Sequence, residues 1–188
     1  VAVALGAQDM FKNIIAGMFI ISEKRFQPGD RIRIGEGLHG IVETIGFRST
    51  QVRLLDTSPV LVPNTDLSDS QVINHSEMNY RRINWTVNLI YNTSTEQLKN
   101  ICSDLQDYIN KSDNFISNPS QESFVKVTEL GSSSIDLTIL CYLEVINYTE
   151  FSQVKQDLIF KIIDIVKHHG SDFAFPSRSI YIENDNSQ

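Results

Sequence analysis

The sequence predicts an α+β protein, in which one half-apolar helix precedes a small all-β domain and a larger domain of mixed strands and helices. Three patterns lead to this prediction: helical apolar spacing up to about residue 27, a run of short strands separated by Gly, Pro and Asp, and a later alternation of longer strands with helices. We therefore divide the chain into residues 1–27, 28–79, 80–176 and 177–188, the last being a terminal strand and tail.

The composition is that of a folded protein rather than a disordered one. Of 188 residues, 41% are hydrophobic and 21% are charged, and the formal net charge is −7. An acidic chain without a basic stripe argues against nucleic acid as a partner, because phosphate binding depends on clustered Lys and Arg. Cys102 and Cys141 fall on apolar faces of a predicted helix and strand, so we expect free thiols rather than a disulfide.

The first segment is too apolar for an ordinary solvated helix and too charged for a lipid-spanning one. Spanning takes about 20 predominantly apolar residues, and Asp9 and Lys12 would each cost about 2.5–3.5 kcal/mol at the bilayer centre. We expect a helix that passes from membrane to water and packs on copies of itself. Small residues that allow such close packing are Ala2, Ala4, Gly6, Ala7, Ala16 and Gly17.

Residues 28–79 predict a small five-stranded barrel of the Sm-like kind. A Pro28-Gly29-Asp30 turn opens this segment, and a polar stretch, Thr65–Ser70, suggests a single helical turn before the last strand. Short runs of alternating apolar residues bounded by turn residues are typical of small barrels. The predicted strands are Arg31–Ile34, Gly40–Ile45, Thr50–Leu55, Val60–Val62 and Val72–Ile73.

Residues 80–176 predict the order strand, helix, strand, strand, helix, strand. Alternation from Ile83 to Leu89 describes a strand buried on one face, and Thr93 with Glu96 predicts a capping box at the start of the first helix. The second helix is expected to end at His169-Gly170. This order, with one solvated sheet face, is typical of a ferredoxin-like α/β sandwich. Ser179–Ile182 is predicted to form the terminal strand.

Three motifs could suggest chemistry, and each has a simpler interpretation. Gly35–Gly40 matches the dinucleotide-binding fingerprint, but the residues after it alternate as a strand and open no helix, so a hairpin turn is predicted. Ser132–Ser134 lacks the setting of a nucleophile and is interpreted as a turn.

His168-His169 could serve as a metal ligand pair or a general base. Adjacent residues of a regular helix point about 100° apart, so we interpret the pair as cations at a helix C-terminus capped by Gly170. No catalytic, cofactor-binding or metal site is predicted, and the chain is not expected to be an enzyme.

Four strings carry a resemblance to a known family: residues 7–30, Ile45–Thr50, Val62–Asn64 and Val72–Ser76. In order and spacing they resemble the pore helix, the glycine-arginine-serine-threonine signature, the proline-asparagine signature and the isoleucine-asparagine signature of the small-conductance mechanosensitive (MscS-like) channels. The resemblance covers essentially the whole chain and is most specific over residues 7–76. It implies that several identical chains, seven in this family, surround a central pore.

The resemblance also implies roles for residues of the first helix. Val1 and Leu5, one turn apart on one face, fall where the family carries the apolar rings that close the pore. Ala2 and Gly6 fall at positions of helix packing.

The same alignment places a bend where the helix leaves the membrane. Gln8 and Asp9 lie at this bend, but Asp9 departs from family members that carry Gly there. Gly17, which matches the family, is therefore an alternative hinge.

The implied function is a tension-gated, weakly selective ion channel that releases small solutes on osmotic downshock, with this chain forming the pore end and a cytoplasmic vestibule. The chain opens on Val rather than Met, so we expect missing upstream helices to contact membrane lipid. The resemblance places it in a bacterial inner membrane, with residues from about 25 onward cytoplasmic. An alternative is a soluble oligomeric scaffold or RNA-binding module, since Sm-like and ferredoxin-like domains occur in both.

Overall fold

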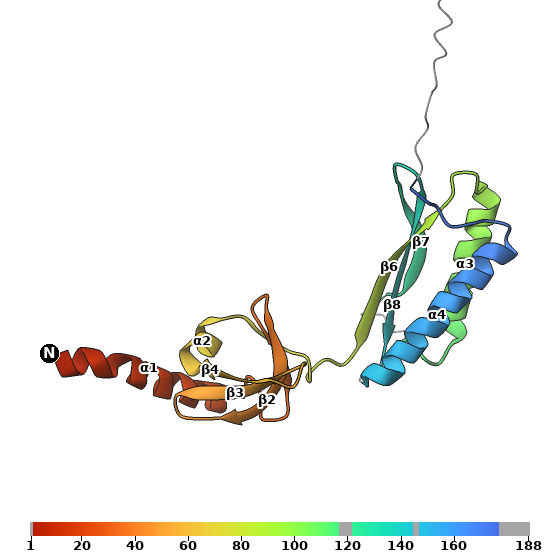
Figure 1. Ribbon diagram of the computed structural model, residues 1–188. Coiled ribbons are helices and arrows are strands. Elements are labelled where there is room, and N and C mark those ends of the chain that lie inside the picture. Colours follow the sequence, from red (N-terminus) through yellow and green to blue (C-terminus); the bar gives the residue numbers. More distant parts are fainter. Residues whose placement is uncertain (1, 117–121, 145–146, 177–188) are drawn as a thin grey trace, which may run out of the picture. The chain divides into compact units, whose positions relative to one another are not determined.

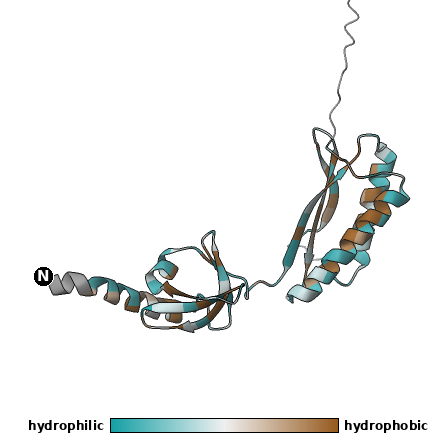
Figure 2. Cartoon of the chain, viewed as in Figure 1, coloured by the Kyte–Doolittle hydropathy of each residue, from teal (hydrophilic) through white to brown (hydrophobic). Residues whose placement is uncertain are grey.

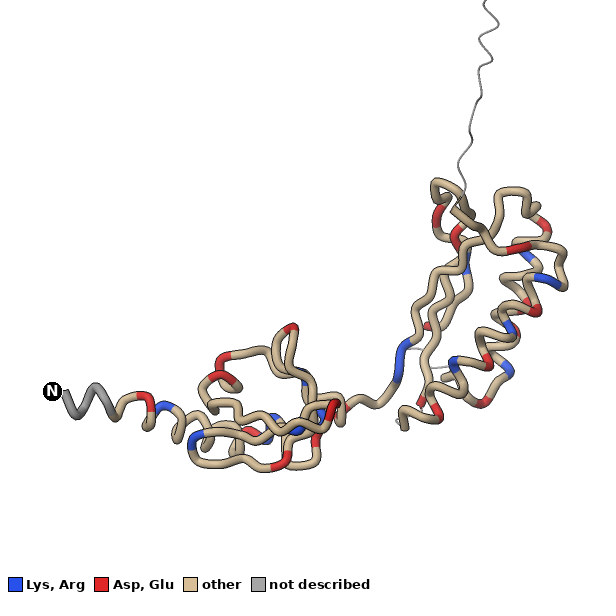
Figure 3. Tube along the Cα trace, viewed as in Figure 1, with Lys and Arg blue, Asp and Glu red and all other residues tan. Residues whose placement is uncertain are grey.

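The computed structural model of the protein describes residues 2–116, 122–144 and 147–176. The chain divides into two compact units, with the boundary in the sequence between Met78 and Asn79 (Figure 1). The first unit contains the N-terminal helix and a five-stranded sheet, and the second contains a three-stranded sheet with two helices. Lys and Arg are interspersed with Asp and Glu in both units (Figure 3).

The N-terminal helix α1 (Ala2–Glu23) continues without interruption through Gln8 and Asp9. It ends at Glu23, and the φ of 53° at the next residue, Lys24, lies in the left-handed region that stops a helix. Hydrophobic and hydrophilic residues are mixed along the described part of α1 (Figure 2). Among the described residues, no helix combines the length and the apolar character needed to cross a lipid bilayer.

The first sheet confirms the predicted small β domain. Its strands are antiparallel in the order β4-β3-β2-β1-β5, so that β5 returns to pair with β1. Gly35, at φ 53°, forms the predicted β1–β2 hairpin turn in place of a phosphate-binding loop. The elements are β1 (Arg31–Ile34), β2 (Leu38–Ile45), β3 (Ser49–Leu54), β4 (Pro59–Pro63), α2 (Asn64–Asp69) and β5 (Val72–Asn74).

The core of the first unit includes one residue of α1 together with residues of the sheet. Ile20 of α1 is fully buried there, so the C-terminal part of the helix belongs to the β domain rather than standing apart from it. The other buried core residues are Phe26, Ile32, Val42, Val52, Val62 and Leu67.

The second unit has the predicted ferredoxin-like arrangement. Its sheet is antiparallel in the order β6-β8-β7, and α3 and α4 lie side by side on one face of it (Figure 1). Alternate residues of β8 are buried toward the helices, as expected for a sheet covered on one side. The elements are β6 (Arg81–Leu89), α3 (Thr95–Lys111), β7 (Phe124–Leu130), β8 (Ile135–Leu143) and α4 (Tyr148–His168).

The expected last strand of this sandwich is reduced to a single bridge. Phe173 pairs antiparallel with Leu89 of β6, and the amide of Ala174 donates to the carbonyl of Asn88 at 2.8 Å. This segment takes the edge position that the fourth strand of a ferredoxin-like sheet occupies. The predicted terminal strand Ser179–Ile182 lies outside the described residues.

The predicted capping box at α3 is wrong by one residue. Ser94 is the N-cap, its side chain accepts from the amide of Gln97, and the Gln97 side chain accepts from the amide of Ser94. Thr93 is unavailable because its buried hydroxyl lies 2.7 Å from both the carbonyl of Ile90 and the hydroxyl of Ser171. A tertiary contact therefore decides which hydroxyl caps the helix.

Other local predictions are confirmed. Gly170 adopts a φ of 69° after α4, and the amides of Gly170 and Ser171 donate to the carbonyls of Lys167 and Val166, which is a Schellman cap. Both cysteines are free thiols, and burial raises the pKa of Cys141 to about 12.

Candidate functional site

A buried polar site lies where α1 rests on the first sheet. At its centre is Asn64, the first residue of α2, which is fully buried. Its side-chain amide donates to the carbonyls of Gly46 at 2.9 Å, Phe47 at 3.1 Å and Asn13 at 3.3 Å. Its side-chain oxygen accepts from the hydroxyl of Thr50 at 2.9 Å. Asn64 thus joins α1 to the turn between β2 and β3.

A second asparagine completes the connection from the helix side. The side-chain oxygen of Asn13 accepts from the amide of Thr65 at 3.1 Å and from its hydroxyl at 3.2 Å. Pro63, the N-cap residue of α2, makes no side-chain hydrogen bond to this helix. The side-chain oxygen of Asn13 instead accepts from an amide in the first turn of α2. We call Asn13, Gly17, Thr50, Asn64 and Thr65 the Asn64 hub.

Gly17 belongs to the hub because nothing larger fits there. A Cβ atom added to Gly17 would lie 2.6 Å from the side-chain nitrogen of Asn64 and 3.4 Å from the carbonyl oxygens of Gly46 and Phe47. Asn64 is held by several hydrogen bonds and cannot move aside freely. Gly17 therefore sets how closely α1 approaches the sheet.

The opposite side of α1 is apolar and exposed in the single chain. Phe11, Ile15, Met18 and Phe19 are 63%, 47%, 59% and 54% exposed, and we call them the outer apolar face of α1. At 100° per residue this face lies opposite Asn13, Gly17 and Ile20, which contact the β domain. An exposed run of large apolar side chains marks a surface that another molecule or a lipid covers.

The predicted hinge residues Gln8 and Asp9 are both exposed. The carboxylate of Asp9 lies 3.9 Å from the ammonium of Lys12, with side chains 91% and 59% exposed, so this ion pair contributes little. Asp9 contacts the hub through its backbone carbonyl, which accepts from the side-chain amide of Asn13 at 2.9 Å, whereas Gly17 lies within the hub.

The predicted gate and packing residues fall at the start of α1. Val1 lies outside the described residues, and Ala2, Leu5 and Gly6 lie in α1 with side chains outside the described part. The gate rings therefore stay a prediction.

The site prediction missed Asn13, Thr50, Asn64 and Thr65. The signals were present, since Asn13, Thr50 and Asn64 belong to three of the strings that carried the resemblance. What the sequence did not reveal is that these residues meet, because 51 positions separate Asn13 from Asn64.

Two family models match consecutive parts of the chain. Residues 9–77 match the mechanosensitive ion channel β-domain, and residues 83–173 match the C-terminal domain of the mechanosensitive ion channel MscS. Both describe parts of ion channels rather than of enzymes, in agreement with the expectation that the chain is no enzyme.

Curated relatives and solved structures point the same way. An uncharacterized MscS family protein of Aquifex aeolicus is 35% identical over 97% of the chain and 49% of the relative. The small-conductance mechanosensitive channel MscMJ of Methanocaldococcus jannaschii is 31% identical over 98% of the chain and 51% of the relative. The closed-state crystal structure of Helicobacter pylori MscS has a TM-score of 0.82 and 28% identity, covering 98% of the chain and 70% of that structure. The chain spans about half the length of these curated relatives.

Proposed function

The chain belongs to the MscS family of mechanosensitive ion channels, and from this premise we propose that it forms the pore end and cytoplasmic vestibule of a tension-gated, weakly selective channel. The channel releases ions and small solutes on osmotic downshock. It is a homo-oligomer, a heptamer in this proposal, anchored in a bacterial inner membrane through upstream helices that contact lipid. Residues from about 25 onward lie in the cytoplasm.

The observation that carries this proposal is the outer apolar face of α1. A helix seated on its own β domain through Asn13, Gly17 and Ile20 leaves Phe11, Ile15 and Met18 exposed. In a ring of identical chains, neighbouring copies and lipid would cover these side chains, which removes them from water.

The gate lies about two to three turns before this face, at Leu5 and Val1. Rings of apolar side chains in a narrow pore exclude water, and an ion stripped of its hydration finds no polar partner there. Ala2 and Gly6 let neighbouring helices approach closely. Membrane tension favours a wider state, and so it shifts a two-state equilibrium as a ligand would.

The Asn64 hub links this movement to the vestibule. Tilting of α1 about Gln8 and Asp9 keeps the contacts of Asn13 with Asn64 and Thr65, because the bend precedes Asn13, and it alters the hydrogen bond from the Asn13 side chain to the carbonyl of Asp9. Tilting about Gly17 instead breaks the contacts of Asn13 with Asn64 and Thr65, which are 3.1–3.3 Å long. The hub therefore favours a hinge at Gln8 and Asp9, with Gly17 as the point of attachment.

Patch recording of Leu5→Asp in the full-length protein tests the gate. A charged ring wets the pore, so the variant is expected to open at lower tension than the wild type. Leu5→Val keeps the ring apolar and serves as the matched control, with a threshold near that of the wild type. An unchanged threshold in Leu5→Asp removes Leu5 from the gate.

The alternative of a soluble scaffold or RNA-binding module gains no support from the family matches. Basic residues are interspersed with acidic ones in both units rather than gathered in a stripe (Figure 3), which is unlike a phosphate-binding surface.

A further inference from the structure

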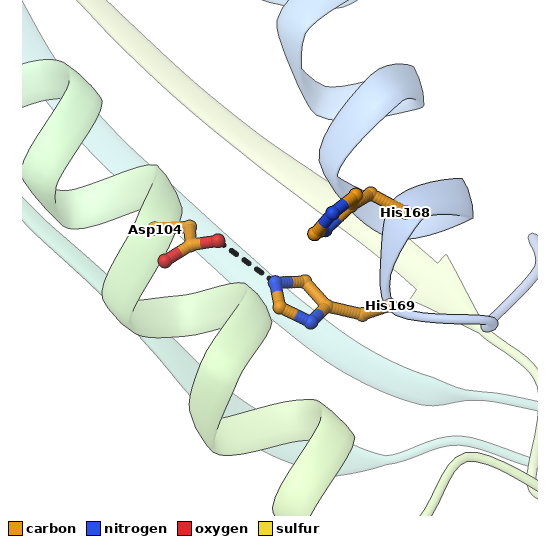
Figure 4. A group of neighbouring side chains, drawn as sticks. All are labelled: Asp104, His168 and His169. Carbon is orange, nitrogen blue, oxygen red and sulfur yellow. Dashed lines mark hydrogen bonds and ion pairs between the residues drawn. The ribbon is translucent and has the colours of Figure 1, made fainter.

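Three metal-ligating side chains meet between the two helices of the second unit. Asp104 of α3 and His168 and His169 at the end of α4 each offer one ligand atom, and these atoms lie within 4.8 Å of one another. Figure 4 shows both imidazole rings on the side of α4 that faces α3, with a nitrogen of His169 directed at the Asp104 carboxylate. That nitrogen, Nε2, lies 2.8 Å from Oδ2 of Asp104.

The rings of the two histidines lie close together at the end of α4. In a regular helix, neighbouring side chains point about 100° apart, which is the reason the sequence argued against a shared ion. His169, however, is the C-cap residue, with φ −83° and ψ 7°. Its ring centroid lies 5.1 Å from that of His168, with the ring planes 83° apart. The side-chain conformations therefore bring the two rings together although the two residues are adjacent.

The backbone that carries the ligands is held by other groups. The side-chain amide of Gln97 donates to the carbonyls of His169 at 2.8 Å and Gly170 at 3.2 Å. The buried hydroxyls of Thr93 and Ser171 lie 2.7 Å apart. These contacts fix the end of α4 against the start of α3 without using a ligand atom. The site is consequently preorganised, and binding an ion requires only side-chain adjustment.

We propose that Asp104, His168 and His169 form a binding site for a divalent transition-metal ion, foremost Zn²⁺. Two imidazoles and a carboxylate are ligands that suit Zn²⁺, with water in the fourth position, whereas Mg²⁺ prefers oxygen ligands alone. Zinc–ligand bonds of about 2.0–2.2 Å in a tetrahedron bring ligand atoms to about 3.3–3.6 Å from one another. Atoms now within 4.8 Å reach this spacing by rotation of the side chains, of which Asp104 and His168 are exposed.

Binding replaces the present hydrogen bond between His169 and Asp104. The proton of His169 moves to Nδ1, which leaves the lone pair of Nε2 for the ion, and the carboxylate turns its oxygen to the same ion. The ion then joins α3 to the end of α4. An ion that binds only the folded chain stabilises this unit by mass action.

Zinc titration of the untagged full-length protein after chelator treatment tests the site, with a chromogenic zinc indicator as competitor. We expect one Zn²⁺ per chain and no comparable binding of Mg²⁺. Loss of a residue that hydrogen-bonds a metal ligand lowers metal affinity about 10–100-fold, and loss of a ligand should lower it at least as much. The variants His168→Gln and Asp104→Asn should therefore each bind Zn²⁺ at least about tenfold more weakly than the wild type. His39→Gln, in the other unit, is the matched control and should bind as the wild type does.

Thermal unfolding in the presence of Zn²⁺ distinguishes a lost site from a misfolded variant. Zn²⁺ should raise the unfolding temperature of the wild type and of His39→Gln, and should leave that of Asp104→Asn, which keeps the side-chain shape, unchanged. Equal zinc affinity of the wild type and His168→Gln, or an equal thermal shift in the wild type and Asp104→Asn, overturns the proposal. So does a wild type that binds no zinc in competition with the indicator.

Discussion

The two units of the chain differ in how much of their apolar surface they bury. In the second unit, α3 and α4 cover one sheet face, and residues such as Leu105, Leu137 and Leu158 are fully buried. In the first unit, α1 contributes Ile20 to a smaller core but leaves Phe11 and Ile15 exposed, and a polar hub holds it in place. The second unit therefore has the larger core within one chain, although Leu130 and Phe160 remain exposed, whereas the first unit leaves one face of a helix uncovered.

Truncation in the second core has the largest expected effect. Leu105→Ala removes a fully buried side chain and should lower the free energy of unfolding by about 2–5 kcal/mol. Trp85 is the sole tryptophan and lies in β6, so urea unfolding followed by its fluorescence reports on this unit. Phe11→Ala, at a site 63% exposed in the other unit, is the control and should leave that transition unchanged. Equal effects of Leu105→Ala and Phe11→Ala on this transition would contradict the difference between the two units.

Loss of the Asn64 side chain should destabilise the first unit. Asn64→Ala leaves the hydroxyl of Thr50 and the carbonyls of Gly46 and Phe47 without their buried partner. An unsatisfied buried polar group costs about 1–3 kcal/mol, so this unit should open more readily. Hydrogen exchange of peptides from β2 to β4 measures the change.

The control for Asn64→Ala keeps the shape of the side chain. Asn64→Asp preserves its size but removes the donor and buries a charge, so it should accelerate exchange at least as much as Asn64→Ala does. Exchange at the wild-type rate in Asn64→Asp would show that Asn64 fills space rather than donating hydrogen bonds.

Gly17→Ala should destabilise the first unit by a smaller amount. Alanine favours a helix over glycine by about 1 kcal/mol, but its Cβ would lie 2.6 Å from Asn64, and overpacking costs about 1–3 kcal/mol. The net loss is therefore at most about 2 kcal/mol, measured by the same hydrogen exchange. Gly37→Ala, with open space around its Cβ, is the matched control. A more stable Gly17→Ala protein would contradict the close packing of α1 on the hub.

The smallest expected effect is loss of the cap on α3. Ser94→Ala removes the side chain that accepts from the amide of Gln97 and should lower the free energy of unfolding of the second unit by about 1 kcal/mol. Thr95→Ala, at the exposed next position, should be neutral or slightly stabilising because alanine is the better helix former. Trp85 fluorescence during urea unfolding measures both variants, and an equal loss in the two would argue against a specific cap.

Local patterns in the sequence were sufficient for much of the fold. Alternation predicted the strands of both sheets, and glycine predicted the positive φ angles at Gly35 and Gly170. Predictions failed or were incomplete where a distant residue decides the outcome. Ser171 engages Thr93 and so moves the cap to Ser94.

The two polar clusters were not predicted, for the same reason: residues far apart in the sequence form them. The Asn64 hub joins residues from α1, β3 and the start of α2, and no local pattern indicates that they meet. The cluster of Asp104 with His168 and His169 depends on where α4 ends and on its packing against α3.

The most direct measurement concerns the outer apolar face of α1 in the assembled protein. Ile15→Cys and, as control, Lys99→Cys on the exposed surface of α3 are introduced into the full-length protein, and native membranes opened to the cytoplasmic side are treated with a membrane-impermeant maleimide. Since both positions are solvent-accessible in the single chain, unequal labelling reports what covers them in the assembly. We predict that the thiol at residue 15 is protected and the thiol at residue 99 reacts. Equal labelling would contradict the claim that copies of the chain or lipid cover this face.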